Sequence, residues 1–185
     1  MSEPGDAAVA ASLTAHVARA FADAPLREVE ATSHVREALP GFKLLAIDTP
    51  GGPTSYVTLG AWTATRDEPE GLEFVLRSRR EHPLLVDALS TAAYYHSFYG
   101  LDEGSVLKVG RGWLPDASGT RLLVLPPTFL PELERAEVGG RRVRFLWLFP
   151  ITPDEQDFLE KRGLPALLER LAAVDPLDPG RASVA

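Results

Sequence analysis

The chain has 185 residues and a formal net charge of −7, with 45% hydrophobic and 24% charged residues. This length suits one domain with a sizeable core, and the composition is that of a globular rather than a disordered protein. The negative net charge disfavours nucleic acid and anionic lipid as partners, because both repel an acidic protein. The chain has no cysteine, which excludes disulfides, thiolate metal sites and thiol catalysis.

The sequence gives no signal for a membrane. The N-terminal residues lack a basic segment followed by an apolar core, and no apolar run approaches the roughly 20 residues that span a bilayer. The lack of cysteine also fits a reducing compartment. We therefore expect a cytoplasmic protein without a membrane partner.

The N-terminal half predicts one helix followed by strands. Residues 1–8 are small or polar and are expected to be flexible. Apolar side chains then recur at spacings of three and four, which predicts a helix that stops near Ala22, ahead of a proline. Apolar, β-branched or alternating segments predict strands at 42–47, 55–65 and 71–77, the last two paired as an antiparallel hairpin.

The C-terminal half predicts a helix, three strands and a final helical region. Pro83 suits the first turn of a helix, where its missing N–H costs nothing. Thr152 and Glu155 have the spacing of a capping box, which predicts the start of the last helical region. An extended tail is expected over 175–185. The strands are expected at 105–109, 121–125 and 142–149, and both faces of the last one become buried towards its end.

No internal repeat or low-complexity linker divides these elements, so residues 1–185 are expected to form one domain. Within it, no catalytic constellation is recognisable. There is no Gly-x-Ser-x-Gly turn and no glycine-rich phosphate loop between a strand and a helix. The four histidines are scattered, with no pair at helical spacing. We expect no catalytic residue, no metal site and no cofactor.

Two groups of charged or polar residues remain open to more than one interpretation. His96 follows two tyrosines on an otherwise apolar helical stripe, and we expect an imidazole at the core edge that bonds to the backbone. The arginine clusters 77–80 and 141–144 could bind an acidic partner, since arginine pairs with carboxylates through two parallel bonds, or could be solvated strand ends.

Aromatic residues in or near predicted loops and helix ends are the remaining candidate feature. Together with arginine, such side chains are typical anchors of protein interfaces, although they could equally cover the core. Phe98 and Tyr99 belong to this group of aromatic residues as well, in addition to the candidate protein-binding residues. The candidate protein-binding residues are Trp62, Tyr94, Tyr95, His96, Arg111 and Trp113.

A series of ordered landmarks over roughly residues 40–184 carries a resemblance to a known family. The landmarks are Tyr56-Val57-Thr58-Leu59-Gly60 with Trp62; Leu72 to Leu76; Ala93-Tyr94-Tyr95-His96; Leu101-Asp102-Glu103-Gly104; Gly110 through Trp113-Leu114-Pro115; Leu125-Pro126-Pro127; Leu146 to Thr152; Glu155, Phe158 and Gly163; and Asp178 to Val184. In this order and spacing, the chain resembles the suppressor-of-fused domain, in particular its stand-alone bacterial members.

The resemblance implies an α+β (mixed α/β) fold with a central mixed, largely antiparallel sheet flanked by helices. It also implies a non-enzymatic, protein-binding role. Animal relatives restrain zinc-finger transcription factors of the Hedgehog pathway, and many bacterial members look like immunity proteins that neutralise toxins of polymorphic toxin systems. An acidic surface would suit a basic toxin.

Two alternatives remain open at this point. One is a small-ligand-binding protein or enzyme with a pocket near Tyr95, His96, Arg111 and Trp113, since such pockets combine apolar walls with a few polar groups. The other is a regulatory scaffold with a transient protein partner.

Overall fold

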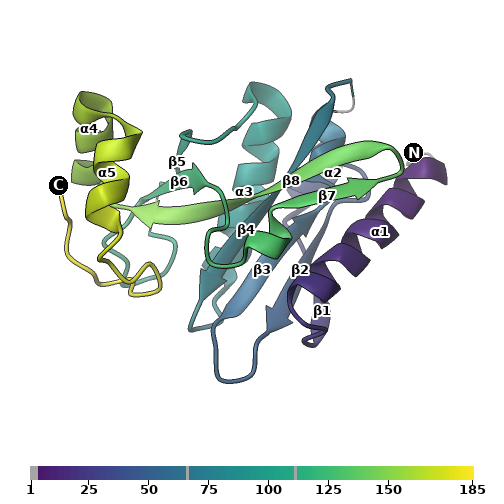
Figure 1. Ribbon diagram of the computed structural model, residues 1–185, viewed down its shortest axis with the longest axis horizontal. Coiled ribbons are helices and arrows are strands. Elements are labelled where there is room, and N and C mark those ends of the chain that lie inside the picture. Colours follow the sequence, from purple (N-terminus) through teal and green to yellow (C-terminus); the bar gives the residue numbers. More distant parts are fainter. Residues whose placement is uncertain (1–3, 66, 111) are drawn as a thin grey trace.

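The computed structural model describes residues 4–65, 67–110 and 112–185, and these form an eight-stranded sheet with helices on both faces (Figure 1). The strands are β1 Leu26–Val29, β2 Lys43–Asp48, β3 Thr54–Leu59, β4 Glu70–Ser78, β5 Val106–Lys108, β6 Arg121–Leu125, β7 Arg135–Val138 and β8 Arg141–Ile151. The helices are α1 Pro4–Ala20, α2 Ser33–Ala38, α3 Pro83–Tyr99, α4 Pro153–Arg162 and α5 Leu164–Leu171, with short 3-10 helices at Ala61–Thr65 and Pro131–Leu133.

The sheet has the order β1-β2-β3-β4-β8-β6-β5, and β7 also pairs with β8. Strands β4 and β8 are parallel, whereas the other pairs are antiparallel. The mixed, largely antiparallel sheet expected from the family resemblance is thereby confirmed. The predicted hairpin of the strands now labelled β3 and β4 is also confirmed.

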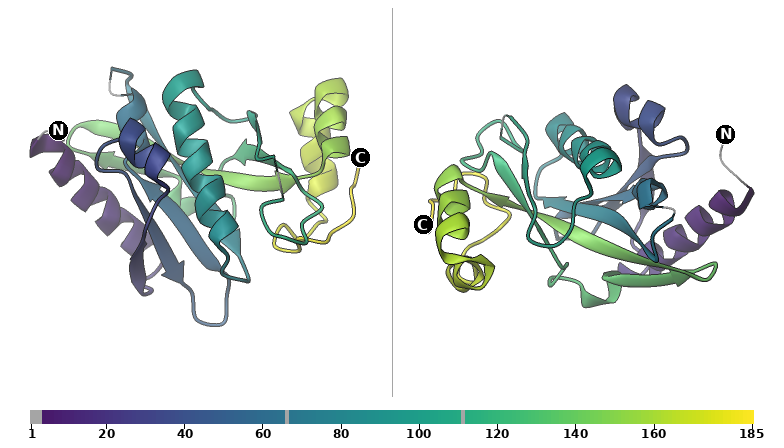
Figure 2. Two further views of the ribbon diagram at one scale, coloured as in Figure 1. Left: turned by 180° about the vertical axis from the view of Figure 1, so that it is seen from behind. Right: turned by 90° about the horizontal axis from the view of Figure 1, so that it is seen from above.

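Strand β8 separates two hydrophobic clusters. Its side chains alternate, so that Phe145 and Trp147 face one cluster while Leu146 and Leu148 face the other. Helices α2 and α3 cover the face that carries Leu146, and helices α1 and α5 contribute to the opposite cluster (Figure 2). The sequence correctly predicts this alternation and the burial of both faces at the C-terminal end of the strand.

The predicted strand at 55–65 is wrong in its second half. Strand β3 ends at Leu59, and Ala61–Thr65 forms a 3-10 helix. Gly60 makes this turn with a φ of +110°, and a Cβ there would lie 3.1 Å from the Cα of Phe42. A carboxyl oxygen of Glu73 accepts the N–H of Gly60 at 2.6 Å, which holds the turn in place.

Several short elements were not predicted from the sequence. Strand β1, helix α2 and strand β7 are four to six residues long and carry few apolar side chains. Residues 4–8, expected to be flexible, lie in the first turns of α1, whereas residues 1–3 lie outside the described part of the chain. No helix in the described ranges combines the length and apolar character needed to cross a bilayer.

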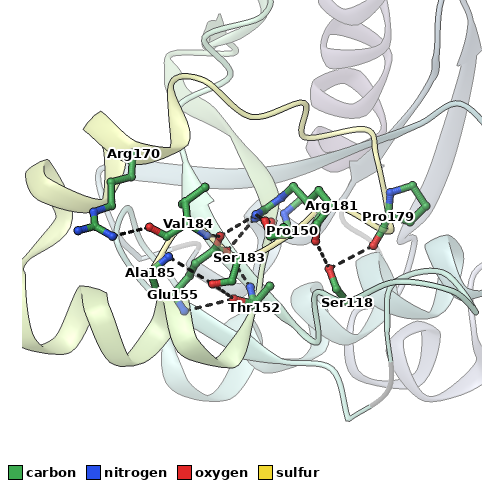
Figure 3. Close-up of polar contacts among 11 residues, drawn as sticks. Ser118, Pro150, Thr152, Glu155, Arg170, Pro179, Arg181, Ser183, Val184 and Ala185 are labelled. Carbon is green, nitrogen blue, oxygen red and sulfur yellow. Dashed lines mark hydrogen bonds and ion pairs between the residues drawn. The ribbon is translucent and has the colours of Figure 1, made fainter.

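The tail over 175–185 contains neither helix nor strand and is fixed by polar contacts (Figure 3). The guanidinium of Arg181 donates to both carboxylate oxygens of Glu155, at 2.6 and 2.7 Å, and to the carbonyl of Pro150 at 2.8 Å. The predicted capping box of Thr152 and Glu155 is confirmed. Glu155 therefore joins the start of α4 to the tail.

Candidate functional site

Helix α3 carries the candidate site, and the chain defines both of its ends. His82 is the N-cap and its Nδ1 accepts the N–H of Leu84 at 3.2 Å, while Pro83 occupies the first turn as predicted. At the other end Gly100, with a φ of +65°, donates its N–H to the carbonyl of His96. The C-terminal turns of the helix point away from the connection to β4 (Figure 1).

The inner face of α3 is fully used in packing against the sheet. Leu85, Leu89 and Ala92 are completely buried in the cluster that also contains Phe74 and Leu146. These positions repeat at the spacing of one helical face. The outer face of the same helix is therefore left to solvent or to a partner.

Four aromatic side chains gather on the last two turns of this outer face. Tyr95 is 42% exposed, Phe98 62% and Tyr99 77%, and Tyr94 is half-buried. The ring centroids of Tyr94 and Phe98 are 4.9 Å apart, and those of Tyr95 and Tyr99 are 5.5 Å apart. We call these four residues the aromatic surface. Large apolar side chains that gather in this way mark interaction sites, whereas single exposed ones are normal.

His96 stands on the inner face and serves the fold. Its Nδ1 accepts the N–H of Leu101 at 3.0 Å, and its ring packs edge-on against Phe74 at 5.5 Å. Burial lowers the pKa of His96, although the nearby Asp102 carboxylate opposes this change. The prediction of a core-edge imidazole bonded to backbone is confirmed.

The two tryptophans of the predicted set lie on opposite faces of the sheet. Trp62 is 4% exposed and packs with the α1 cluster, while Trp113 is 1% exposed and packs with the α3 cluster. Neither presents its ring to a partner in this conformation. Arg111, the remaining member of the set, lies outside the described residues. The structure thus brings Tyr94 and Tyr95 together with Phe98 and Tyr99.

Most of the clustered arginines contact groups within the chain, and Arg142 is exposed. Arg77 stacks over the ring of Phe129 at 4.0 Å, and burial lowers the pKa of its guanidinium. The other contacts are Arg79 with Asp175 at 2.7 Å, Arg80 with Asp116 at 2.6 Å, Arg141 with the carbonyl of Glu68 at 3.2 Å, and Arg144 with Glu70 and Asp102 at 2.6 Å each. These contacts favour a structural role over an acidic partner.

A cavity of about 240 Å³ lies beside Trp113. Its lining includes His34, Asp87 and Thr91 but neither Tyr95 nor His96. Of the pocket expected near Tyr95, His96, Arg111 and Trp113, this cavity therefore includes Trp113 but not the two residues of α3, and Arg111 lies outside the described residues. Among the described residues, no group of three or more histidine or carboxylate side chains could hold a metal ion.

Among the described residues, the other exposed large apolar side chain lies at a groove of about 380 Å³. Leu168 of α5 is 38% exposed and lines it together with Trp147 and Phe149. This groove contains one outward side chain, whereas the aromatic surface presents three in adjacent turns. The aromatic surface is therefore the stronger candidate site.

A family model described as suppressor of fused protein matches residues 41–182. The chain belongs to the suppressor of fused family. This finding confirms the resemblance seen in the sequence, and no curated protein sequence matches the chain.

Solved structures of the suppressor of fused family share the fold. A homolog from Neisseria gonorrhoeae FA 1090 superposes with a TM-score of 0.84 at 25% identity, over 96% of this chain and 97% of that one. A chain of the Sufu–Fu complex gives a TM-score of 0.71 at 13% identity, over 96% of this chain and 92% of that one. Drosophila Suppressor of Fused gives 0.72 at 13% identity, over 96% of this chain and 51% of that one. The suppressor-of-fused fold supports a protein-interaction domain.

Proposed function

We propose that this suppressor-of-fused domain binds another protein through the aromatic surface of α3 and has no catalytic role. The observation that carries the proposal is the joint exposure of Tyr95, Phe98 and Tyr99 on a helix whose inner face is fully packed. Aromatic side chains supply large contact areas at interface centres. One structural relative comes from a complex described as Sufu–Fu, which fits a protein partner.

The charge of the chain favours a basic partner. With a net charge of −7, the domain would attract a positively charged protein and speed its association. A basic toxin is such a partner, and the domain would then act as an immunity protein. The absence of cysteine is in keeping with an encounter in the cytoplasm.

Affinity capture with three forms of the chain tests the binding surface. The baits are the wild type, the double variant Phe98→Gln with Tyr99→Gln, and Leu168→Gln. Glutamine keeps helix propensity while removing the exposed apolar groups. Leu168→Gln is the matched control, because it removes an exposed apolar side chain at the separate groove near α5.

We expect the wild type and Leu168→Gln to capture a protein that the double variant does not capture. With purified components, the wild type and Leu168→Gln should bind this protein more tightly than the double variant does. Equal retention by the double variant would overturn the aromatic surface as the binding site. Loss with Leu168→Gln alone would place the interface at the α5 groove instead. Co-expression with the captured protein then tests immunity: protection from its toxicity supports that role, and a non-toxic partner favours regulation.

A further inference from the structure

The outer face of α3 continues from the aromatic surface towards the start of the helix. Thr91 and Asp87 lie one and two turns, respectively, before Tyr94 and Tyr95 on the same side. Asp87 is exposed, and no residue in the described ranges makes a hydrogen bond or an ion pair with its carboxylate. This face of the helix is thus aromatic at one end and anionic at the other.

Two cavities flank the anionic end, and Asp87 lines both. The larger, of about 510 Å³, lies between β1 and the first turns of α3 and is also lined by Tyr56 and Val86. The smaller is the 240 Å³ cavity beside Trp113. His34 lines this smaller cavity and packs edge-on against Tyr94 with ring centroids 5.3 Å apart. The smaller cavity therefore adjoins the aromatic surface, and Asp87 is common to both cavities.

Acidic groups outnumber basic ones around the larger cavity. Its lining contains Glu30, Glu81 and Asp87 but a single arginine, Arg27. That arginine is already shared between Glu81 and Asp48. Glu30 pairs with Arg36, which is outside the lining, at 3.2 Å. A cation that entered beside Asp87 would meet an unpaired carboxylate, and the one arginine among the described lining residues, Arg27, is already held by Glu81 and Asp48.

We propose that this outer face of α3 binds a segment of the partner that carries an arginine or lysine near an apolar side chain. The cation lies beside Asp87, and the apolar side chain rests on the aromatic surface. This inference rests on the proposed function, because it describes the chemistry of the partner at the same surface. The net charge of −7 acts in the same direction.

The helix sets the distance between the two contacts. From Asp87 to Tyr95 and Phe98 the helix rises about 12 to 17 Å at 1.5 Å per residue. An extended peptide covers this distance in about four or five residues at 3.3 Å each. The partner segment should therefore hold its cationic and apolar side chains about four or five residues apart.

Synthetic nine-residue peptides test this pairing. Each probe carries one leucine and one arginine separated by four or five residues in a glycine-serine background. Two matched probes replace the arginine with citrulline, which keeps the shape without the charge, or with glutamate. Affinities are measured by fluorescence anisotropy for the wild type, Asp87→Asn, the control Asp157→Asn at an exposed position of α4, and the Phe98→Gln, Tyr99→Gln double variant.

We expect the wild type to bind the arginine peptide about two- to fivefold more tightly than the citrulline peptide, as for an exposed ion pair, and the glutamate peptide least. Asp87→Asn should abolish this preference without changing affinity for the citrulline peptide, and Asp157→Asn should preserve it. The double variant should weaken all three peptides equally.

Equal binding of arginine and citrulline peptides by the wild type would overturn the inference, as would a preference that survives in Asp87→Asn. No measurable binding of any probe would overturn it as well. Sedimentation would identify a second copy of the chain as the occupant if it shows a dimer that Asp87→Asn dissociates. The proposed function fails by a different result, namely capture of the same partner by the double variant.

Discussion

Arg181 binds the completely buried carboxylate of Glu155 through two hydrogen bonds, and this contact fastens the C-terminal tail to α4 (Figure 3). The Arg181 side chain is itself only 9% exposed. Burial would raise the pKa of Glu155, but Arg181 and the N–H groups of Thr152 and Val184 outweigh it and hold the pKa below its ordinary value. The tail is thus a structural part of the domain.

Arg181→Met should strongly destabilise the protein, because it leaves a buried carboxylate without its cation. Breaking a buried pair on one side typically costs about 3–5 kcal/mol. Urea denaturation at pH 7, followed by circular dichroism, measures the loss. Arg162→Met, at the exposed end of α4, is the control and should leave the denaturation midpoint nearly unchanged. A similar midpoint for both variants would contradict the structural role of the pair.

The Arg181–Glu155 pair should also make the stability of the protein depend on pH in the acidic range. A carboxylate with a depressed pKa stabilises the fold above its unfolded pKa of about 4.5, and this contribution is lost as the pH falls through the lower folded pKa. Without Arg181 the carboxylate takes up a proton more readily. The stability gap between wild type and Arg181→Met should therefore narrow below pH 4.5, and a constant gap down to pH 3 would argue against this linkage.

Glu73 should give the opposite pH dependence. Burial raises the pKa of this carboxyl to about 8, although Thr58 and the backbone N–H groups of Gly60, Trp62 and Ala61 favour its ionised form. Between the unfolded pKa of 4.5 and about 8, the folded state binds the extra proton. Stability is therefore greatest below this range and falls as the pH rises through it, by up to about 1.4 kcal/mol per pH unit.

Glu73→Gln isolates this contribution, since the amide oxygen can still accept the N–H of Gly60 without titrating. Denaturation of both proteins from pH 5 to pH 9 measures the difference. The stability of Glu73→Gln relative to wild type should increase as the pH rises and become constant above pH 8. An unchanging difference across the range would show that Glu73 does not titrate there.

Gly71 is required where β4 passes the 3-10 helix. A Cβ at this position would lie 2.7 Å from the Cβ of Trp62, a buried side chain that cannot move freely. Gly71→Ala should therefore cost about 1–3 kcal/mol through overpacking. Gly180→Ala is the matched control, since its nearest contact would be 3.7 Å from a carboxylate oxygen of Asp178. Comparable thermal midpoints for the two variants would disprove the clash.

The sequence correctly predicts the elements whose residues show a complete local pattern. Strand β8 has strict alternation over a long segment, and α4 has a complete capping box. Strand β1 and helix α2 have neither. Leu26–Val29 has two exposed charged residues between two half-buried apolar ones, and its place in the sheet depends on pairing with β2. Such pairing is decided by tertiary contacts that a four-residue pattern does not contain.

The sequence predicts only part of the candidate site, because the other part depends on tertiary contacts. Placing Leu85, Leu89 and His96 on one apolar stripe also implies that Tyr95 and Phe98 point outward, so the aromatic surface was readable from helical spacing. Trp62 and Trp113 were not distinguishable from surface aromatics, because their burial comes from packing after the chain folds. Asp87 had no signal of its own, since one of its cavities is bounded by β1, which was not predicted.

A substitution on the inner face of α3 should destabilise the protein, whereas substitutions on its outer face should leave the stability nearly unchanged. Ala93 is completely buried against the sheet, so Ala93→Leu forces extra volume into a packed cluster and should cost about 1–3 kcal/mol. The double variant Phe98→Gln, Tyr99→Gln changes exposed side chains and should stay within about 0.5 kcal/mol of wild type per site.

Urea denaturation of the two variants beside wild type measures this contrast, and it decides how a loss of binding is interpreted. If the double variant is as stable as wild type, a lost partner reflects a lost contact surface. If it unfolds as readily as Ala93→Leu, Phe98 and Tyr99 support the fold, and the aromatic surface would no longer be available as a binding site.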